Sequence, residues 1–257
     1  MGIFWLPDDK GVPRKLQLAN HSKKDRQMRG LGIFVILVVL GGCAQPVDPV
    51  SATRTFDVTP EPAQVTRSFG DVVRRIEPVA ESFCRARTRK MNCDFQFLIN
   101  TKPGQPANAF QRVDSRGRPV IIVNRALLRQ VRNIDEMAFI LGHETGHHIN
   151  GHLERKQANA TTGAILMGTL AELGGAGRAE IDTAVELGAK LGARKFSKAY
   201  ELEADQLGTV IAAQAGFNPV RGAAFFTRIP DPGNLFLGTH PPNAARIEIV
   251  RRTAARL

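Results

Sequence analysis

Apolar residues recur at helical spacing in several stretches of this chain. Over residues 68–87 they fall three or four positions apart, which is typical of one face of an amphipathic helix. The residues of this face are Phe69, Val72, Val73, Ile76, Val79 and Phe83. Asn133 is a good cap for a second helix, and Asp135 and Glu136 in its first turn interact favourably with the helix dipole. The pattern thus predicts two helices that each bury one side.

Short apolar runs between these two helices predict a small sheet. Residues 95–98 form one strand candidate, and residues 110–113 and 120–123 flank a polar turn that contains Gly117, as in a hairpin. Further helices are expected over residues 125–131, from Ser197 as a cap to Gly216, from Asn218 onward and over 242–257. These elements indicate an α+β, mostly helical domain with a small β-sheet over residues 68–257.

Residues 156–196 have an unusual composition, because they are rich in alanine and glycine. Charged side chains such as Glu172, Arg178 and Asp182 interrupt their apolar stretches. A membrane-spanning helix needs about 20 predominantly apolar residues, which this segment does not offer. We expect helices that lie along the rest of the core.

The N-terminal part of the chain has the layout of an export signal. Basic residues precede the apolar run 31–40, which is too short to cross a bilayer and leads into small residues and Cys43. Leu-Gly-Gly-Cys at 40–43 resembles the bacterial lipobox. This resemblance implies that residues 1–42 are removed as a signal peptide and that Cys43 is a lipid anchor. An ordinary secretory signal with an incidental cysteine is the alternative.

The residues around this signal refine the expected location. Met28 would start a compact signal peptide, which makes residues 1–27 an extension from a mis-called start. Ala44 follows Cys43 where Asp would favour retention at the inner membrane, so sorting rules favour the periplasmic side of the outer membrane. Proline among polar residues indicates that residues 43–67 form an extended tether.

The two other cysteines, Cys84 and Cys93, would then lie in an oxidising compartment. An even pair there predicts a disulfide that closes a short loop, and two free thiols are the alternative.

The net charge of +11 points to no particular partner. Residues 1–42 hold seven Lys or Arg and three Asp or Glu, so their removal leaves +7. A basic surface can attract nucleic acid or anionic lipid, but no dense Lys/Arg block follows residue 42. A scattered, solvated charge is the interpretation we favour, and no nucleic-acid-binding module is recognised.

Four of the six histidines fall within residues 143–152. His143 and His147 are four apart on a predicted helix, so both can bind one tetrahedral zinc ion. Glu144, beside the first of them, can take a proton from the attacking water and pass it to the leaving amine. The preceding apolar residues 139–141 predict a buried helix, in which unpaired His and Glu would be costly.

A second helix offers the remaining ligand. Glu201 and Asp205 are four apart and face the same way, so Glu201 can be the third zinc ligand. Asp205 can accept the outer N–H of a ligand histidine, most simply His143, and fix its tautomer. A third ligand of the metzincin type fails, because that pattern needs Gly and His where this chain has Asn150 and Leu153.

Four neighbouring residues receive less specific interpretations. His152 lies about 180° from His143 on a continuous helix, so we expect it to end the helix with Gly151, away from the site. His148 is expected to pack behind the site, and Glu203 to be solvated or ion-paired. Tyr200 could donate to the oxyanion, although its helix position turns it from the face of Glu201.

Four ordered segments resemble one family, the HtpX/BepA/LoiP group of zinc endopeptidases, which are relatives of the CAAX-prenyl endopeptidases. The segments are LGHETGHHINGH (141–152), FSKAYELEADQLG (196–208), AGFNPVRGAAFF (215–226) and THPPNAARI (239–247). The resemblance covers residues 68–257 and is nearest to the single-domain, LoiP-like lipoproteins. Lys198 departs from the Arg usual in the family, so a contact made there would be weaker.

The resemblance implies a gluzincin-like metallopeptidase domain with one Zn²⁺ per chain. It implies His143, His147 and Glu201 as ligands and Glu144 as the general base and acid. It further implies His240 as a fourth ligand in a closed state and Arg246 as a cleft residue near the oxyanion. On sequence alone, His240 could equally be an exposed residue at a helix entry, and Arg246 a surface charge.

The lipobox and the zinc site together suggest a role. The expected substrates are unfolded or misassembled envelope proteins, bound by pairing with an edge strand. The rival hypothesis is a chaperone that works with the outer-membrane assembly machinery and whose zinc site is latched and rarely active.

Overall fold

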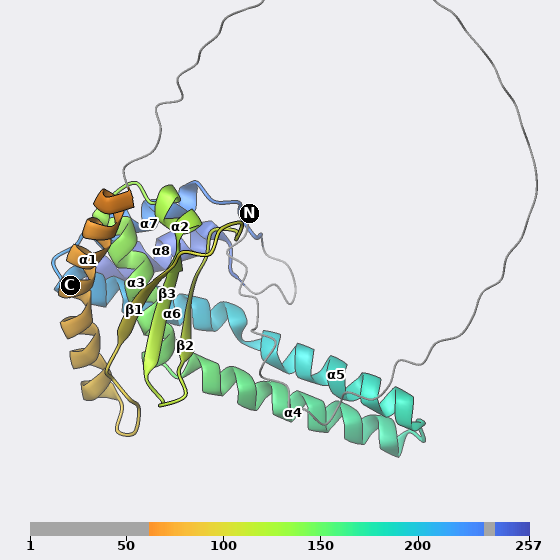
Figure 1. Cartoon of the computed structure of the whole chain (residues 1–257). Coiled ribbons are helices and arrows are strands. Elements are labelled where there is room, and N and C mark those ends of the chain that lie inside the picture. Colours follow the sequence, from red (N-terminus) through yellow and green to blue (C-terminus); the bar gives the residue numbers. More distant parts are fainter. Residues whose placement is uncertain (1–61, 234–239) are drawn as a thin grey trace, which may run out of the picture. The chain divides into compact units, whose positions relative to one another are not determined.

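The computed structural model describes residues 62–233 and 240–257, so Cys43 and the predicted signal peptide lie outside the described residues. The described elements, in chain order, are α1 (Pro62–Arg87), β1 (Gln96–Asn100), β2 (Ala109–Val113), β3 (Pro119–Asn124), α2 (Arg125–Gln130), α3 (Ile134–Ile149), α4 (His152–Leu173), α5 (Arg178–Lys195), α6 (Ser197–Gln214), α7 (Pro219–Ala223), the 3₁₀ helix η1 (Ala224–Thr227) and α8 (Asn243–Ala254). The predicted fold class, mostly helical with a small sheet, is confirmed (Figure 1).

The sheet has the order β1-β3-β2 and is mixed. β2 and β3 form the predicted antiparallel hairpin, whereas β1 pairs with β3 in parallel. In the turn, the Asp114 carboxylate accepts N–H bonds from Arg116 and Arg118, both at 2.8 Å, and Gly117 adopts a φ of 78° that favours glycine. All six residues of the central strand β3 are buried, which explains the apolar run that precedes its last residue, Asn124.

The core lies where α3 meets α1 on one side and α6 on another. α1 begins at Pro62 rather than at residue 68, so it includes part of the segment predicted as a tether. Cys84, near the end of this helix, forms a disulfide with Cys93 just before β1, with their Cα atoms 5.6 Å apart. The bond joins the end of α1 to the start of the sheet.

The alanine- and glycine-rich segment differs from its prediction. We expected helices that lie along the core, but α4 and α5 pack mainly on each other and extend away from the sheet (Figure 1). Glycines explain this preference: a Cβ on Gly188 would lie 2.1 Å from the Gly163 carbonyl oxygen, so the two backbones are in contact. Ser197 is also no cap, because it is the first helical residue of α6 and its hydroxyl donates to Ala193 O at 3.1 Å.

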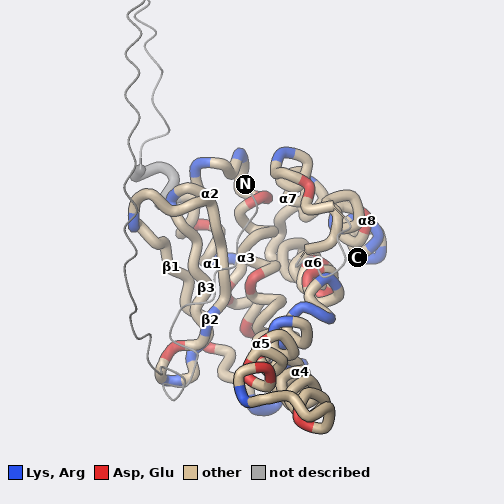
Figure 2. The backbone as a smooth tube through the Cα atoms, turned by 90° about the vertical axis from the view of Figure 1, so that its right-hand side faces the viewer, with Lys and Arg blue, Asp and Glu red and all other residues tan. Residues whose placement is uncertain are grey.

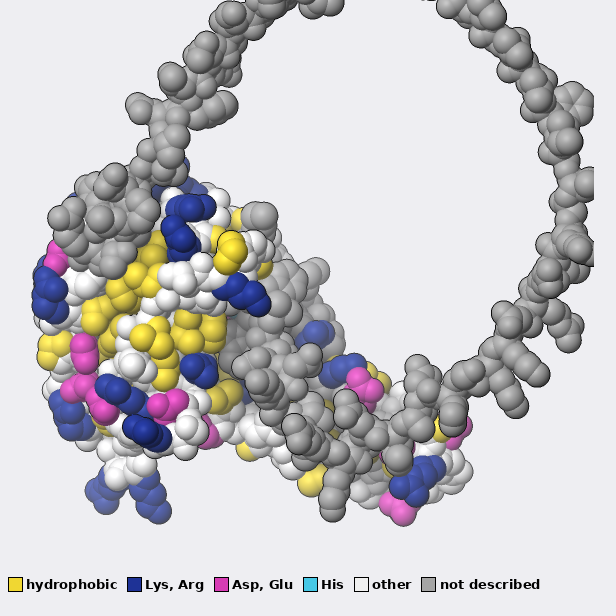
Figure 3. Space-filling model, in the orientation of Figure 1, with side chains coloured by type: hydrophobic (Ala, Val, Ile, Leu, Met, Phe, Trp, Pro, Cys, Tyr) yellow, Lys and Arg dark blue, Asp and Glu magenta, His cyan; other side chains and the backbone are white. Residues whose placement is uncertain are grey.

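The surface agrees with a scattered charge. Basic and acidic positions are interspersed around the described elements (Figure 2). Apolar side chains lie open on the face that carries α1 and the sheet (Figure 3). Leu98 of β1 is 38% exposed. Within the described ranges, no helix combines the length and the apolar character needed to cross a membrane.

Candidate active site

The site lies where α3 and α6 pack so closely that their backbones are in contact. A Cβ on Gly142 would lie 2.8 Å from Gly208 O, and one on Gly208 would lie 2.7 Å from His143 N. Real Cβ atoms do not come this close, so only glycine permits the contact. The small residues therefore bring side chains of α3 within reach of those of α6.

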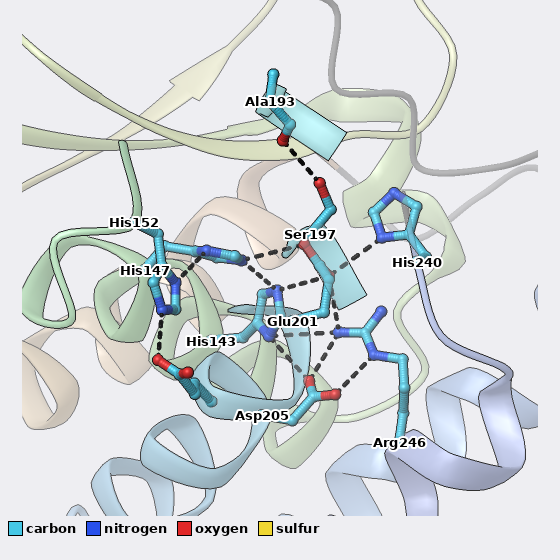
Figure 4. Close-up of polar contacts among 10 residues, drawn as sticks. His143, His147, His152, Ala193, Ser197, Glu201, Asp205, His240 and Arg246 are labelled. Atoms are coloured by element: carbon cyan, nitrogen blue, oxygen red, sulfur yellow. Dashed lines mark hydrogen bonds and ion pairs between the residues drawn. The ribbon is translucent and has the colours of Figure 1, made fainter. Parts of the chain in front are cut away.

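Three side chains converge across this contact (Figure 4). Nε2 of His143 and Nε2 of His147 lie 3.1 Å apart, and they lie 3.6 and 3.4 Å, respectively, from the two carboxylate oxygens of Glu201. Two atoms bound to one zinc ion in a tetrahedron are about 3.3 Å apart, given bonds of about 2.0 Å. The three residues thus fit one metal ion, and they form the metal-ligand group found in the described part of the chain.

The charge state of Glu201 suits a ligand. Burial by itself raises the pKa of its carboxyl, but the neighbouring imidazoles of His147 and His240 and the charge of Arg246 outweigh burial and hold the pKa well below its usual value. Glu201 is therefore an anion in this site.

His240 reaches the same carboxylate from the segment before α8 (Figure 4). Its Nδ1 lies 3.1 Å from Glu201 Oε2, yet it is buried and makes no aligned hydrogen bond to any described residue. A buried nitrogen whose nearest polar neighbour is a ligand carboxylate, without an aligned hydrogen bond to it, is a second sign that the site fits a metal ion. The role of His240 as a fourth ligand stays a prediction.

Asp205 and Arg246 form the support behind His143. Nδ1 of His143 lies 2.9 Å from Asp205 Oδ1, so its Nε2 is left to face the other ligands. The Arg246 guanidinium donates to both oxygens of Asp205 at 2.7 Å, and its Nη2 lies 3.6 Å from Glu201. Arg246 is 5% exposed and lies over the ring of Phe226. Its polar partners are thus Asp205 and Glu201, on the ligand side of the site. A contact of Arg246 with the oxyanion stays a prediction.

His152 does not lie away from the site, as the sequence suggested. Its Nδ1 is 2.9 Å from Nδ1 of His147, and its Nε2 is 3.1 Å from Glu203 Oε2. The prediction placed the ring by the rotation of a single helix that ends at Gly151 and His152. Gly151 instead adopts the left-handed conformation, with φ 63°, and His152 is the first residue of a new helix. The turn carries His152 back over His147. Burial, followed by the charge of His147, lowers the pKa of His152 to about 4.

The other residues singled out lie outside the ligand cluster. His148 packs against Phe95 and its Nε2 lies 2.9 Å from Asn92 O, behind the site as expected. Tyr200 faces His152 with stacked rings, and its hydroxyl accepts a bond from Asn159 at 2.8 Å. Glu203 pairs with Arg155 at 2.7 Å.

A cavity of about 520 Å³ opens over the ligands. Glu144 lines it beside His143 and His147, and burial raises the pKa of its carboxyl. The role of Glu144 as general base and acid stays a prediction. Ala109 and Gln111 of the edge strand β2 line the same cavity, next to an apolar wall that includes Phe225 and Phe226.

Comparison with known proteins agrees with this geometry. Residues 67–254 match Peptidase family M48. The chain is 28% identical over 152 residues to the beta-barrel assembly-enhancing protease of Yersinia pestis, a match that covers 53% of this chain and 31% of that protein. The protein of the same name from Escherichia coli O157:H7 is 28% identical over 178 residues, which cover 63% of this chain and 34% of the relative.

A third relative comes from a plant. The mitochondrial metalloendopeptidase OMA1 of Arabidopsis thaliana is 27% identical over 134 residues, which cover 51% of this chain and 27% of that protein. The chain therefore spans about a third of the length of these relatives. The family match covers most of the chain, and it includes both helices of the ligand cluster. This chain belongs to peptidase family M48, and His143, His147 and Glu201 give it the metal-ligand set of a metalloendopeptidase.

Proposed function

We propose that this chain is a zinc-dependent endopeptidase of the bacterial cell envelope, which cleaves unfolded or misassembled envelope proteins. The observation that carries the proposal is the convergence of His143, His147 and Glu201 beneath a cavity that Glu144 also lines. Zinc bound there would supply Lewis-acid activation of a water molecule and of the scissile carbonyl.

Glu144 and Asp205 have separate tasks in the proposed peptide hydrolysis. Glu144 takes the proton of the attacking water and later gives it to the leaving amine, for which a raised pKa is suited. Asp205 holds His143 in the tautomer that leaves its Nε2 free as a ligand.

The edge strand β2 is suited to substrate binding. It pairs with β3 on one side, and Ala109 and Gln111 line the cavity. An extended polypeptide can add to such an edge through main-chain hydrogen bonds, which do not depend on most side chains. This favours unfolded chains as substrates.

The proposed location rests on the N-terminal sequence and the relatives. The lipobox at 40–43 supports lipid attachment through Cys43, as in the single-domain lipoproteins of the resembling group. The name of two relatives refers to β-barrel assembly, and the Cys84–Cys93 disulfide suits an oxidising compartment. The periplasmic face of the outer membrane is therefore the proposed site of action.

The decisive experiment compares wild type with Glu144→Gln in the mature, lipid-free form. Casein cleavage should fall by about 10²–10⁴-fold, since the substitution removes the general base, while zinc content measured by mass spectrometry stays at one per chain. Full proteolysis by Glu144→Gln would refute the mechanism. A wild type without bound metal would refute the zinc site.

The second candidate function is an assembly factor or chaperone with a latched zinc site. The position of His240, 3.1 Å from the Glu201 carboxylate, favours it. If His240 blocks the site, His240→Ala should cleave casein faster than wild type. Unchanged or lost cleavage would count against a latch.

A further inference from the structure

The two histidines of the ligand cluster have unlike partners on their outer nitrogens. Nδ1 of His143 faces the ionised Asp205, which Arg246 holds from behind. Nδ1 of His147 instead faces another imidazole, that of His152, at 2.9 Å. His152 is 4% exposed, so water does not compete for this contact.

The positions of the protons follow from this chain of contacts. Nε2 of His147 faces Nε2 of His143 and Glu201, so as a ligand it carries no proton. The single proton of the neutral ring is then on Nδ1, which donates to Nδ1 of His152. His152 must carry its own proton on Nε2, which donates to Glu203 at 3.1 Å. Both N–H groups in this series, that of His147 and that of His152, thus meet an acceptor.

His152 is held in place by more than these two bonds. Its ring stacks on Tyr200, with ring centres 4.7 Å apart and planes 13° apart. Arg155 donates to Glu203 at 2.7 Å and lies over the same Tyr200 ring at 4.2 Å. The imidazole thus lies between a carboxylate and an aromatic face, in one orientation.

We infer that His152 is a positioning residue that, together with Glu203, fixes the orientation and tautomer of the metal ligand His147. It does for His147 what Asp205 does for His143, but it brings no charge to the ligand itself. Outer partners of this kind raise metal affinity because the ligand nitrogen is aimed before the ion arrives. The inference rests on the proposed metal site.

The helix break at Gly151 makes this arrangement possible. On one unbroken helix, His152 would lie on the side opposite His143. The left-handed residue Gly151 ends α3 and starts α4 at His152, which turns the ring toward His147. α4 therefore contributes to the site through its first residue, although most of its length lies outside it.

The test measures metal binding on the full chain with its disulfide intact. Zinc affinity is determined by competition with a chelator, and the absorption spectrum of the Co²⁺-loaded protein reports ligand geometry. His152→Ala should bind zinc about 10–100-fold more weakly, with an altered Co²⁺ spectrum. His152→Asn should recover most of the affinity, because its amide can accept from His147 and donate.

His148→Ala is the matched control, since His148 is a buried neighbour on α3 that contacts Asn92 and Gln111 instead of a ligand. It should keep wild-type zinc affinity. Equal affinities of wild type and His152→Ala, or equal losses in His152→Ala and His148→Ala, would overturn the inference.

Two further outcomes keep the test decisive. If His152→Ala does not fold, Glu203→Ala, at a partly exposed position, carries the test, with a smaller loss of zinc affinity expected and an unchanged affinity overturning the inference. A wild type that binds neither Zn²⁺ nor Co²⁺ would refute the proposed function, and the inference with it. Tight binding in wild type with no effect of His152 would refute the inference alone.

Discussion

Two helix pairs in this chain, α3 with α6 and α4 with α5, both pack through glycines, but their surroundings differ. In both pairs, glycines let the backbones touch: Gly142 and Gly208 in the first, Gly163 and Gly188 in the second. The first pair holds the candidate metal site, and the second extends from the core as a hairpin (Figure 1). Close backbone contact by itself therefore does not make a site.

The surroundings explain the difference. Nearly every residue of α3 is buried, because α1, the sheet, α7 and α6 cover it. His143 and His147 of this helix face Glu201 and Asp205 of α6. On α4, Leu166, Leu170 and Leu173 are 57%, 55% and 80% exposed. Burial raises the cost of an unpaired charge, so the covered pair can hold Glu201 and Asp205 only as part of a network.

Removal of the metal should have the largest effect and act on one pair alone. Chelation should abolish casein cleavage and lower the melting temperature, because an ion present at 1,000 times its dissociation constant stabilises the fold by about 4 kcal/mol. Amide hydrogen exchange should speed up in α3 and α6 and stay unchanged in α4 and α5. Equal loss of protection in both pairs would contradict the comparison.

Gly208→Ala should damage the covered pair next most strongly. The added methyl would lie 2.7 Å from His143 N, so α3 and α6 must separate, at a cost of about 3 kcal/mol. Denaturant unfolding and zinc competition should both show the loss. Gly70→Ala is the control, since its Cβ would meet only the end of Arg74 at 3.7 Å and the change should leave zinc affinity intact.

Gly188→Ala applies the same change to the hairpin. Its Cβ would clash with Gly163 O, so the hairpin should open, with a loss of about 2 kcal/mol confined to α4 and α5. Hydrogen exchange should detect that opening, and zinc affinity should match wild type. A marked fall in zinc affinity would show that the two pairs are coupled more tightly than their contacts suggest.

Leu173→Gln should have the smallest effect. The side chain is 80% exposed, so unfolding free energy should change by less than about 0.5 kcal/mol. Leu141→Ala, at a fully buried position of α3, should by contrast cost about 2–5 kcal/mol. A large effect of Leu173→Gln on urea unfolding would mean that the flank of α4 is covered in solution.

Local patterns accounted for the elements and the ligand set. The hairpin of β2 and β3, the Asn133 cap of α3 and the spacing of Glu201 and Asp205 depend on residues close in sequence, so periodicity and turn chemistry sufficed. The prediction for His152 was wrong because it placed the ring by the rotation of one helix, although it already expected that helix to end at Gly151 and His152. Glycine marked the end of the helix, but the sequence could not give the direction in which the next helix leaves it.

Long-range packing could not be derived in this way. The parallel pairing of β1 with β3 and the outward direction of α4 and α5 depend on which surfaces meet. The error at Ser197 has a local cause, because its hydroxyl donates to the carbonyl of Ala193, four residues earlier, and Ser197 is already the first residue of α6.

The sequence by itself determined which side chains can share one metal site, because His143 and His147 lie on one face of a helix and Glu201 and Asp205 lie on one face of another. Only the tertiary structure decided that the two faces meet, that Arg246 supports Asp205 and that His152 supports His147. The reason is physical: spacing along a helix sets the face of a side chain, whereas its partners are set by backbones that must come close enough to touch.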